Sequence, residues 1–170
     1  IFMDKLYAPW RDRYVHQAIK GDAQGSCVFC DIFNTDESDE QRFVLFKDAS
    51  VAVILNIYPY NGGHLLIIPK EHVAEFDKIS DKHLGQSMVA VSKSMNIIKE
   101  VLGCAGMNFG ANIGKTAGAG IPQHVHMHIV PRFSGDTGFF TTIGNAKQIS
   151  VDLQNMYNKL KPAFDKAFRG

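Results

Sequence analysis

Residues 124–130 of the chain read His-Val-His-Met-His-Ile-Val, so that histidine alternates with apolar residues. Side chains on a β-strand point alternately to its two faces, and we therefore predict a strand over 124–130 with His124, His126 and His128 on one face. The apolar residues between them would anchor this strand to the core. A row of imidazoles is typical of two kinds of site: a metal centre, or a histidine nucleophile with supporting histidines.

The segments around this strand predict the rest of the fold. Short runs of residues that favour β-structure predict further strands at 43–46, 51–55, 64–68 and 107–113. Apolar residues then recur every three or four positions, which predicts a long helix from an N-cap at Ser80 to a stop at Gly103, with Met88 and Met95 in the core. A C-terminal helix is predicted at about 149–168, interrupted by Pro162. Together these elements indicate an α+β fold with a largely antiparallel, five-stranded sheet.

Composition narrows the class of protein. A chain of 170 residues with 45% hydrophobic residues and 12 Phe predicts one globular domain over 1–170, with its core at about 27–135. A net charge of +1 argues against a nucleic-acid partner. The apolar runs are too short for a membrane span, and no signal peptide is evident. With only 3 Cys, which is too few for a disulfide framework, we predict a cytoplasmic protein.

Two of the cysteines form a Cys-x-x-Cys pair, Cys27 and Cys30. This spacing suits tetrahedral zinc, and His72 with one histidine of the 124–128 row could complete a closed, structural site. Two inert buried cysteines or a redox pair are the alternatives, although a redox pair should follow a strand of a βαβ unit.

Two glycine-containing loops are candidates for ligand contact. In the first, Gly62-Gly63 allows a sharp turn, and Asn56 and His64 lie at the strand edges beside it. An ordinary hairpin turn is the alternative there. The second loop, around Gly114, could present backbone N–H groups to an anion. It is not a P-loop, because only three residues separate Gly110 from Gly114.

Taken together, these segments resemble the histidine triad (HIT) family of nucleotide hydrolases and transferases. The shared features are the His-x-His-x-His string followed by two apolar residues, Asn56 eight residues before His64, and the segment Pro69-Lys70-Glu71-His72. The resemblance covers about residues 27–135. More narrowly, the leader 7–11 and the tail 135–137 look like the bacterial branch that includes diadenosine tetraphosphate phosphorylases.

The resemblance implies a role for each matching residue. His126 would be the nucleophile that forms a covalent nucleotidyl-imidazole, with His128 and His64 flanking the phosphate. The substrate-binding positions would be Asn56 for the ribose, Phe29, Ile32 and Ile57 for the base, and Asn112, Gly114 and Gln123 near the phosphates. The zinc ligands would be Cys27, Cys30, His72 and His124.

One position departs from the family pattern. Many members carry Ser or Thr three residues before the triad, and this chain has Ile121 there. Leaving-group assistance must then come from Gln123 or from a metal such as Mg²⁺ on the polyphosphate, which favours dinucleoside polyphosphates over phosphoramidates as substrates. The family also implies a homodimer. Two other classes stay open: a hydrolase with zinc-activated water, and a zinc-stabilised nucleotide-binding adaptor without turnover.

Overall fold

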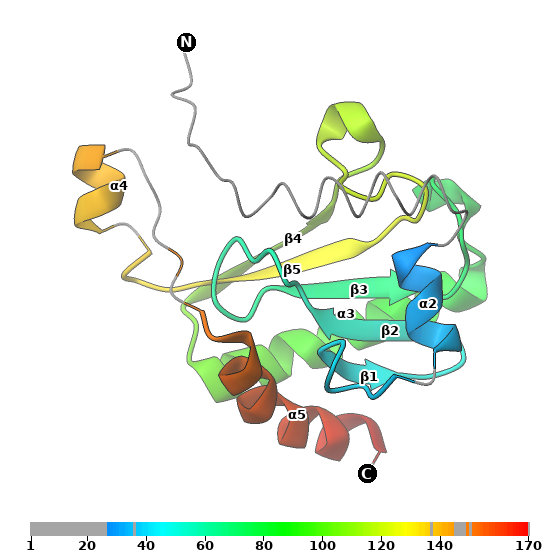
Figure 1. The fold of residues 1–170 in the computed structure, drawn as a ribbon, viewed down its shortest axis with the longest axis horizontal. Coiled ribbons are helices and arrows are strands. Elements are labelled where there is room, and N and C mark those ends of the chain that lie inside the picture. The colour runs from blue at the N-terminus through cyan, green and yellow to red at the C-terminus, as the bar shows by residue number, and fades with distance from the viewer. Residues whose placement is uncertain (1–26, 36, 137, 145–148, 150, 170) are drawn as a thin grey trace.

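The computed structural model describes residues 27–169 except 36, 137, 145–148 and 150. A central sheet carries helices on both of its faces (Figure 1). In chain order the elements are α2 (Val28–Asn34), β1 (Val44–Lys47), β2 (Val51–Leu55), β3 (Leu65–Pro69), η2 (Phe76–Lys78), α3 (Asp81–Leu102), β4 (Gly106–Ala111), η3 (Lys115–Ala117), β5 (Met127–Arg132), α4 (Phe139–Gly144) and α5 (Leu153–Arg169). The leader at 7–11 lies outside the described residues.

The sheet has five strands in the order β1-β2-β3-β5-β4, and every neighbouring pair is antiparallel. The predicted α+β class and the five-stranded antiparallel sheet are therefore confirmed. The short segment between β1 and β2 closes the predicted hairpin, in which the Asp48 carboxylate accepts from the backbone N–H groups of Ser50 and Val51. This topology places the histidine-bearing β5 inside the sheet, between β3 and β4.

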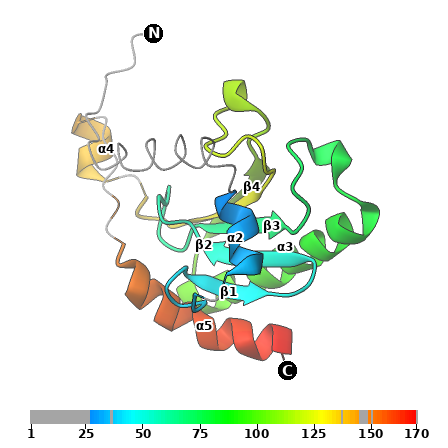
Figure 2. The same ribbon diagram turned by 45° about the vertical axis from the view of Figure 1, so that its right-hand side comes forward.

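Alternation along the strands divides the core into two layers. In β2, Ala52 and Ile54 pack on the side of α2, and Val53 and Leu55 pack on the opposite side with α3 and α5. Figure 2 shows α2 in front of the sheet and α3 behind it. Met127 and Ile129 of β5 belong to the α3 side, as the predicted apolar anchors should. The intervening histidines are thereby left to the α2 side.

The long helix α3 begins and ends where the sequence predicts. The Ser80 hydroxyl accepts from the backbone N–H of His83, and Gly103 ends the helix with φ of 64°. Met95 packs against the core as predicted. The prediction for Met88 is wrong, because its side chain is 41% exposed. Small residues such as Ser87 and Ala90 occupy the core side of that turn instead.

The predicted interruption at Pro162 is also wrong, because α5 runs through it as a continuous helix. The proline ring lies on the exposed side, so the carbonyl that loses its helical N–H partner faces solvent. Tyr157, Leu160 and Phe164 are buried on the other side and hold both halves against the core. None of the described helices is both long and apolar enough to cross a membrane.

Strand β5 begins at Met127, and not at His124 as the alternation predicts. The reason is a backbone hydrogen bond of 2.7 Å, in which the N–H of Val125 donates to the carbonyl of Val73 and not to a strand of the sheet. Likewise, β4 ends at Ala111, two residues before the predicted end. His124 and His126 therefore lie just before the strand, where their nitrogens can take separate partners.

Candidate active site and metal cluster

His126 is held in one tautomer by the backbone. Its Nδ1 lies 2.9 Å from the carbonyl oxygen of His124. A carbonyl can only accept, so Nδ1 carries the proton and Nε2 presents a lone pair. Burial lowers the pKa of His126 to about 4, against the opposing effect of that hydrogen bond. The ring is thus a neutral, fixed imidazole near neutral pH, which is the form that acts as a nucleophile.

His64 is fixed by hydrogen-bond partners at both of its ring nitrogens. The backbone N–H of Tyr60 donates to Nδ1 at 3.0 Å, so the proton of this neutral ring must lie on Nε2. Nε2 lies 3.0 Å from Nδ1 of His128 and donates to it. Burial first, and then His128 and His126, lower the pKa of His64 to about 3, which keeps this pattern intact at neutral pH.

His128 completes the arrangement. Because its Nδ1 accepts from His64, its own proton lies on Nε2, and burial lowers its pKa so that the ring is neutral. This Nε2–H is buried and has no hydrogen-bond partner among the described residues. The rings of His126 and His128 are 5.0 Å apart. A lone pair and an unpartnered N–H donor therefore stand side by side, which suits attack on a group that carries anionic oxygens.

The predicted substrate-binding residues differ in how close they lie to these histidines. Asn56 is next to His64, to which its Nδ2 donates at 3.2 Å, and its Oδ1 accepts from the backbone N–H of Tyr58 at 2.9 Å. It therefore forms the turn that the sequence left as an alternative, in addition to any ligand contact. Phe29 lies edge-on to His126, with ring centroids 4.8 Å apart.

The remaining predicted positions are spread around this centre. Ile32 is buried in the cluster under α2, whereas Ile57 is 50% exposed. The register of β4 with β5 pairs Ala111 with Met127, which puts Asn112 at the level of His126. Gly114 has φ of 80°, a conformation that glycine adopts readily, at the start of the η3 turn. Gln123 directly precedes His124 and is half-buried.

Tyr60 also belongs to this site, although it was not predicted from the sequence. Its backbone fixes the tautomer of His64, and its ring is 51% exposed and lies nearly parallel to that of His128, 6.0 Å away. An aromatic residue just before the Gly62-Gly63 turn was the available signal. An exposed ring beside the histidines is a surface on which a planar group can stack.

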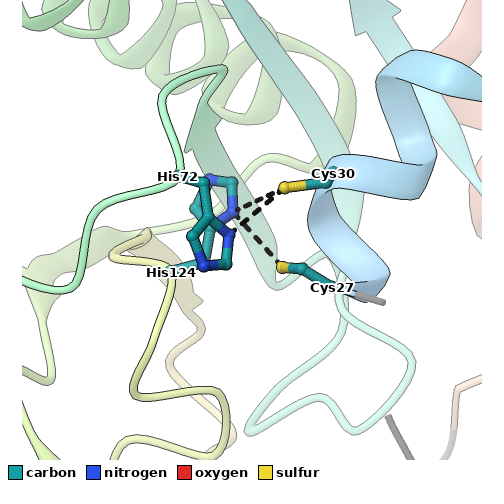
Figure 3. A group of neighbouring side chains, drawn as sticks. All are labelled: Cys27, Cys30, His72 and His124. Carbon is teal, nitrogen blue, oxygen red and sulfur yellow. Dashed lines mark hydrogen bonds between the residues drawn. The ribbon is translucent and has the colours of Figure 1, made fainter. Parts of the chain in front are cut away.

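The four predicted zinc ligands meet in one cluster (Figure 3). Cys27 precedes α2, Cys30 lies in its first turn, and both thiols face His72 and His124, so that all four ligand atoms lie within 4.8 Å of one another. Nε2 of His124 lies 2.8 Å from the carbonyl of Pro69 and must donate to it. The Nδ1 lone pair of His124 is then free to serve as a ligand toward the thiols.

The distances within the cluster fit a tetrahedral ion. With Zn–S near 2.3 Å and Zn–N near 2.0 Å, a tetrahedral site has S···N edges of about 3.5 Å. The Sγ of Cys27 lies 3.4 Å from Nδ1 of His124, and the Sγ of Cys30 lies 3.2 Å and 3.7 Å from Nδ1 of His72 and His124. Burial and the neighbouring Cys27 raise the pKa of the Cys30 thiol to about 11, so a cation is needed to hold two thiolates here. Two Cys and two His with no further position form a closed, structural site.

The HIT domain sequence profile matches residues 37–135, more than half of the chain, and the chain therefore belongs to the HIT family. It is 35% identical over 156 residues to the AP-4-A phosphorylase of Mycobacterium tuberculosis (strain H37Rv), which is 90% of this chain and 80% of that protein. It is also 36% identical over 135 residues to an uncharacterized HIT-like protein of Methanocaldococcus jannaschii, 79% of this chain and 98% of that one.

Solved structures are similar to this fold as well. A zinc-bound histidine triad family protein from Mycobacterium smegmatis has a TM-score of 0.67 and 27% identity, covering 84% of this chain and 95% of that one. A hypothetical histidine triad nucleotide-binding protein from Sulfolobus tokodaii has a TM-score of 0.65 and 26% identity, covering 84% and 92%. The zinc-bound relative and the Cys₂His₂ cluster of this chain together indicate a zinc-binding member of a nucleotide-processing family.

Proposed function

We propose that this protein cleaves dinucleoside polyphosphates such as diadenosine tetraphosphate by transferring a nucleotidyl group through His126. The observation that carries the proposal is the pairing of the Nε2 lone pair of His126 with the unpartnered Nε2–H of His128. The similarity to the AP-4-A phosphorylase of Mycobacterium tuberculosis favours this substrate class, and favours inorganic phosphate over water as the acceptor.

In the first step, Nε2 of His126 attacks the α-phosphorus next to one of the two adenosines of the substrate. A P–N bond forms, the P–O bond to the β-phosphate breaks, and ATP leaves with the electron pair of that bond. In the second step, a phosphate oxygen attacks the same phosphorus, the P–N bond breaks, and ADP is released with His126 neutral again. The Nε2–H of His128 would donate to the equatorial oxygens as their charge grows. The carbonyl of His124 holds the proton on Nδ1 throughout.

The supporting roles follow from position. Both ring nitrogens of His64 are engaged by protein groups and its side chain is 1% exposed, so we assign it to positioning His128 and not to phosphate contact. Asn56 would bind the ribose through its remaining N–H. Phe29 and Ile57 would flank the base, with Ile32 packed behind them. Asn112, Gly114 and Gln123 would contribute donors near the phosphates. Mg²⁺ would arrive with the polyphosphate, since the described Cys/His cluster suits zinc.

Zinc would hold α2 against the segment that carries the histidines. Cys27 and Cys30 come from α2, His72 follows β3 and His124 precedes β5, so one ion would join three segments. Its thiolate ligands require reduced cysteines, which is consistent with the predicted cytoplasmic location.

The test is product analysis after incubation with diadenosine tetraphosphate, with and without inorganic phosphate. We expect ADP plus ATP only when phosphate is present. AMP plus ATP in the absence of phosphate would make the protein a hydrolase of the same substrate. If neither condition yields products while the nucleotide still binds, the adaptor class would replace the enzyme. Products from an adenosine phosphoramidate alone would instead move the chain to that branch of the family.

We also propose a homodimer that forms through β4, which lies at an edge of the sheet and carries Phe109 with 43% exposure. Light scattering should then give about twice the 18.9 kDa of one chain. Phe109→Lys should reduce the mass to that of a monomer, whereas Ile143→Lys, at a 71% exposed position on α4, should leave the dimer intact. The opposite pattern would exclude β4 as the contact.

A further inference from the structure

The turn that follows β5 places a carboxylate in a network of hydrogen bonds. Oδ1 of Asp136 accepts from Nδ2 of Asn61 at 2.8 Å. Oδ2 accepts from Nε of Arg132 at 2.8 Å and from the backbone N–H of Phe133 at 3.1 Å. The Asp136 side chain is only 9% exposed, whereas that of Arg132 is 50% exposed. The ion pair at the surface is screened, so the buried, charge-assisted bond to Asn61 is the stronger constraint.

Asn61 connects this carboxylate to the loop between β2 and β3. Its Nδ2 also donates to the carbonyl of Pro131 at 2.8 Å. The backbone carbonyl of Asn61 accepts from the backbone N–H of His64 at 3.2 Å. The residue is 9% exposed. Asn61 is thus bound to β5 on one side and to His64 on the other.

Packing limits how far the loop can move if these bonds are lost. Gly63 has φ of +79°, and a Cβ there would lie 2.4 Å from Cδ1 of Leu102. A Cβ on Gly62 would be in contact with Val151 and Met156, which come from the C-terminal part of the chain. The loop between β2 and β3 is therefore packed against α3 at Gly63 and against the C-terminal segment at Gly62. The hydrogen bonds of Asn61 fix its position relative to β5.

We propose that Asn61 and Asp136 form a clamp that positions His64 and, through the bond from His64 Nε2 to His128 Nδ1, sets the direction of the His128 Nε2–H. Both are positioning residues that touch no substrate, and their effect on turnover rests on the proposed function. Asp136 lies one residue beyond the part of the chain that the HIT domain profile matches. The clamp would thus add to the family domain a support that comes from the segment after it.

The direct test reads the histidines without any substrate. In zinc-loaded protein, ¹⁵N NMR should find the His64 proton on Nε2 and protected from exchange with solvent. In Asp136→Ala and in Asn61→Ala we expect this proton to exchange at least about tenfold faster, because the bond to His128 opens more often. In the double variant the exchange should be no faster than in Asn61→Ala alone, since Asp136 acts through its contact with Asn61. Arg132→Gln, which removes the exposed partner of Asp136, should leave exchange within about twofold of wild type.

The second readout is kinetic. With diadenosine tetraphosphate and phosphate, Asp136→Ala should lower kcat by about 10- to 100-fold with little change in KM, as expected when a reacting group is displaced without loss of binding. Thermal unfolding checks that each variant is folded. If Asp136→Ala does not fold, Asp136→Asn can replace it, because asparagine has the shape of aspartate and keeps one acceptor oxygen. This variant should show smaller changes of the same kind in proton exchange and in kcat.

The outcomes separate the two proposals. Unchanged exchange of the His64 proton in a folded Asp136→Ala or Asp136→Asn variant would overturn the clamp, whatever the activity. Faster exchange in that variant, in a protein whose wild type turns over no dinucleotide, would support the clamp and refute the proposed function. Equal effects of Arg132→Gln and Asp136→Ala would assign the network to surface charge and would also overturn the clamp.

Discussion

Replacing His126 with alanine is expected to lower turnover of diadenosine tetraphosphate by about 10⁴-fold or more, with nucleotide affinity nearly intact. The reason is that the lone pair proposed to attack phosphorus is lost, while the residues proposed to bind ribose and base remain. Alanine also leaves the His64–His128 pair in place, because His128 is bonded to His64 and not to His126. Rates with wild-type protein and the variant at saturating substrate measure this directly.

The covalent intermediate gives the same prediction a second readout. Wild-type protein mixed with substrate and no acceptor, then quenched in alkali, should gain the mass of one adenylyl group, and His126→Ala should gain none. His83→Gln is the matched control, because His83 lies on α3 and bonds to Glu71. It should react like wild type. Full turnover by His126→Ala, or turnover by wild type with no adduct under any condition, would refute nucleophilic catalysis by His126.

Removing zinc should produce the largest change in stability. A structural ion present at about 1,000 times its dissociation constant contributes about 4 kcal/mol to the free energy of unfolding. Since 1 kcal/mol shifts the midpoint by about 2–4 °C in a chain of this size, chelation should lower the midpoint by about 10 °C. Cys30→Ser should have a similar effect and should reduce bound zinc, because serine is a poor zinc ligand.

Cys104→Ser is the control for that experiment. Cys104 is buried at 8% exposure, like Cys27, but it lies in the core on the α3 side, away from the cluster. It should keep a full equivalent of zinc by elemental analysis, and chelation should shift its midpoint as it does in wild type. A midpoint that does not respond to chelator in zinc-loaded wild type would show that the cluster does not support the fold.

The alternation at 124–130 predicted that Met127 and Ile129 pack in the core, because these apolar side chains need the core whatever the local backbone does. It did not predict that His124 and His126 are also buried, at 0% and 6% exposure. It could not predict where the strand begins. That boundary depends on the bond from Val125 to the carbonyl of Val73, a residue that is distant in sequence. The three histidines still lie on the side of the sheet opposite to Met127 and Ile129, but His124 and His126 precede the strand and so take different backbone partners.

Residue types and spacing predicted a zinc site at Cys27, Cys30 and His72 with one histidine of the triad, since few side chains bind zinc and the Cys-x-x-Cys pair restricts the geometry. The choice of His124 as the fourth ligand came from the resemblance to the HIT family. The supporting contacts could not be predicted in this way. Tyr60 acts through its backbone N–H, which every residue except proline has, and Asn61 and Asp136 meet across 75 positions in the sequence. Such contacts leave no local pattern. Likewise, α5 passes through Pro162 only because the proline faces solvent, a fact that depends on tertiary packing.

His124 takes part in both sites: its ring faces the cysteines, and its carbonyl fixes the proton of His126. A chelator that releases zinc would therefore loosen the residue whose carbonyl orients the proposed nucleophile, although none of the four residues that would hold the ion is proposed to react. In an assay, the proposed enzyme would therefore look like a metalloenzyme. Loss of activity on chelation cannot be taken here as a sign of metal-activated water, and thiol oxidants that attack Cys27 or Cys30 would inactivate it by the same indirect route.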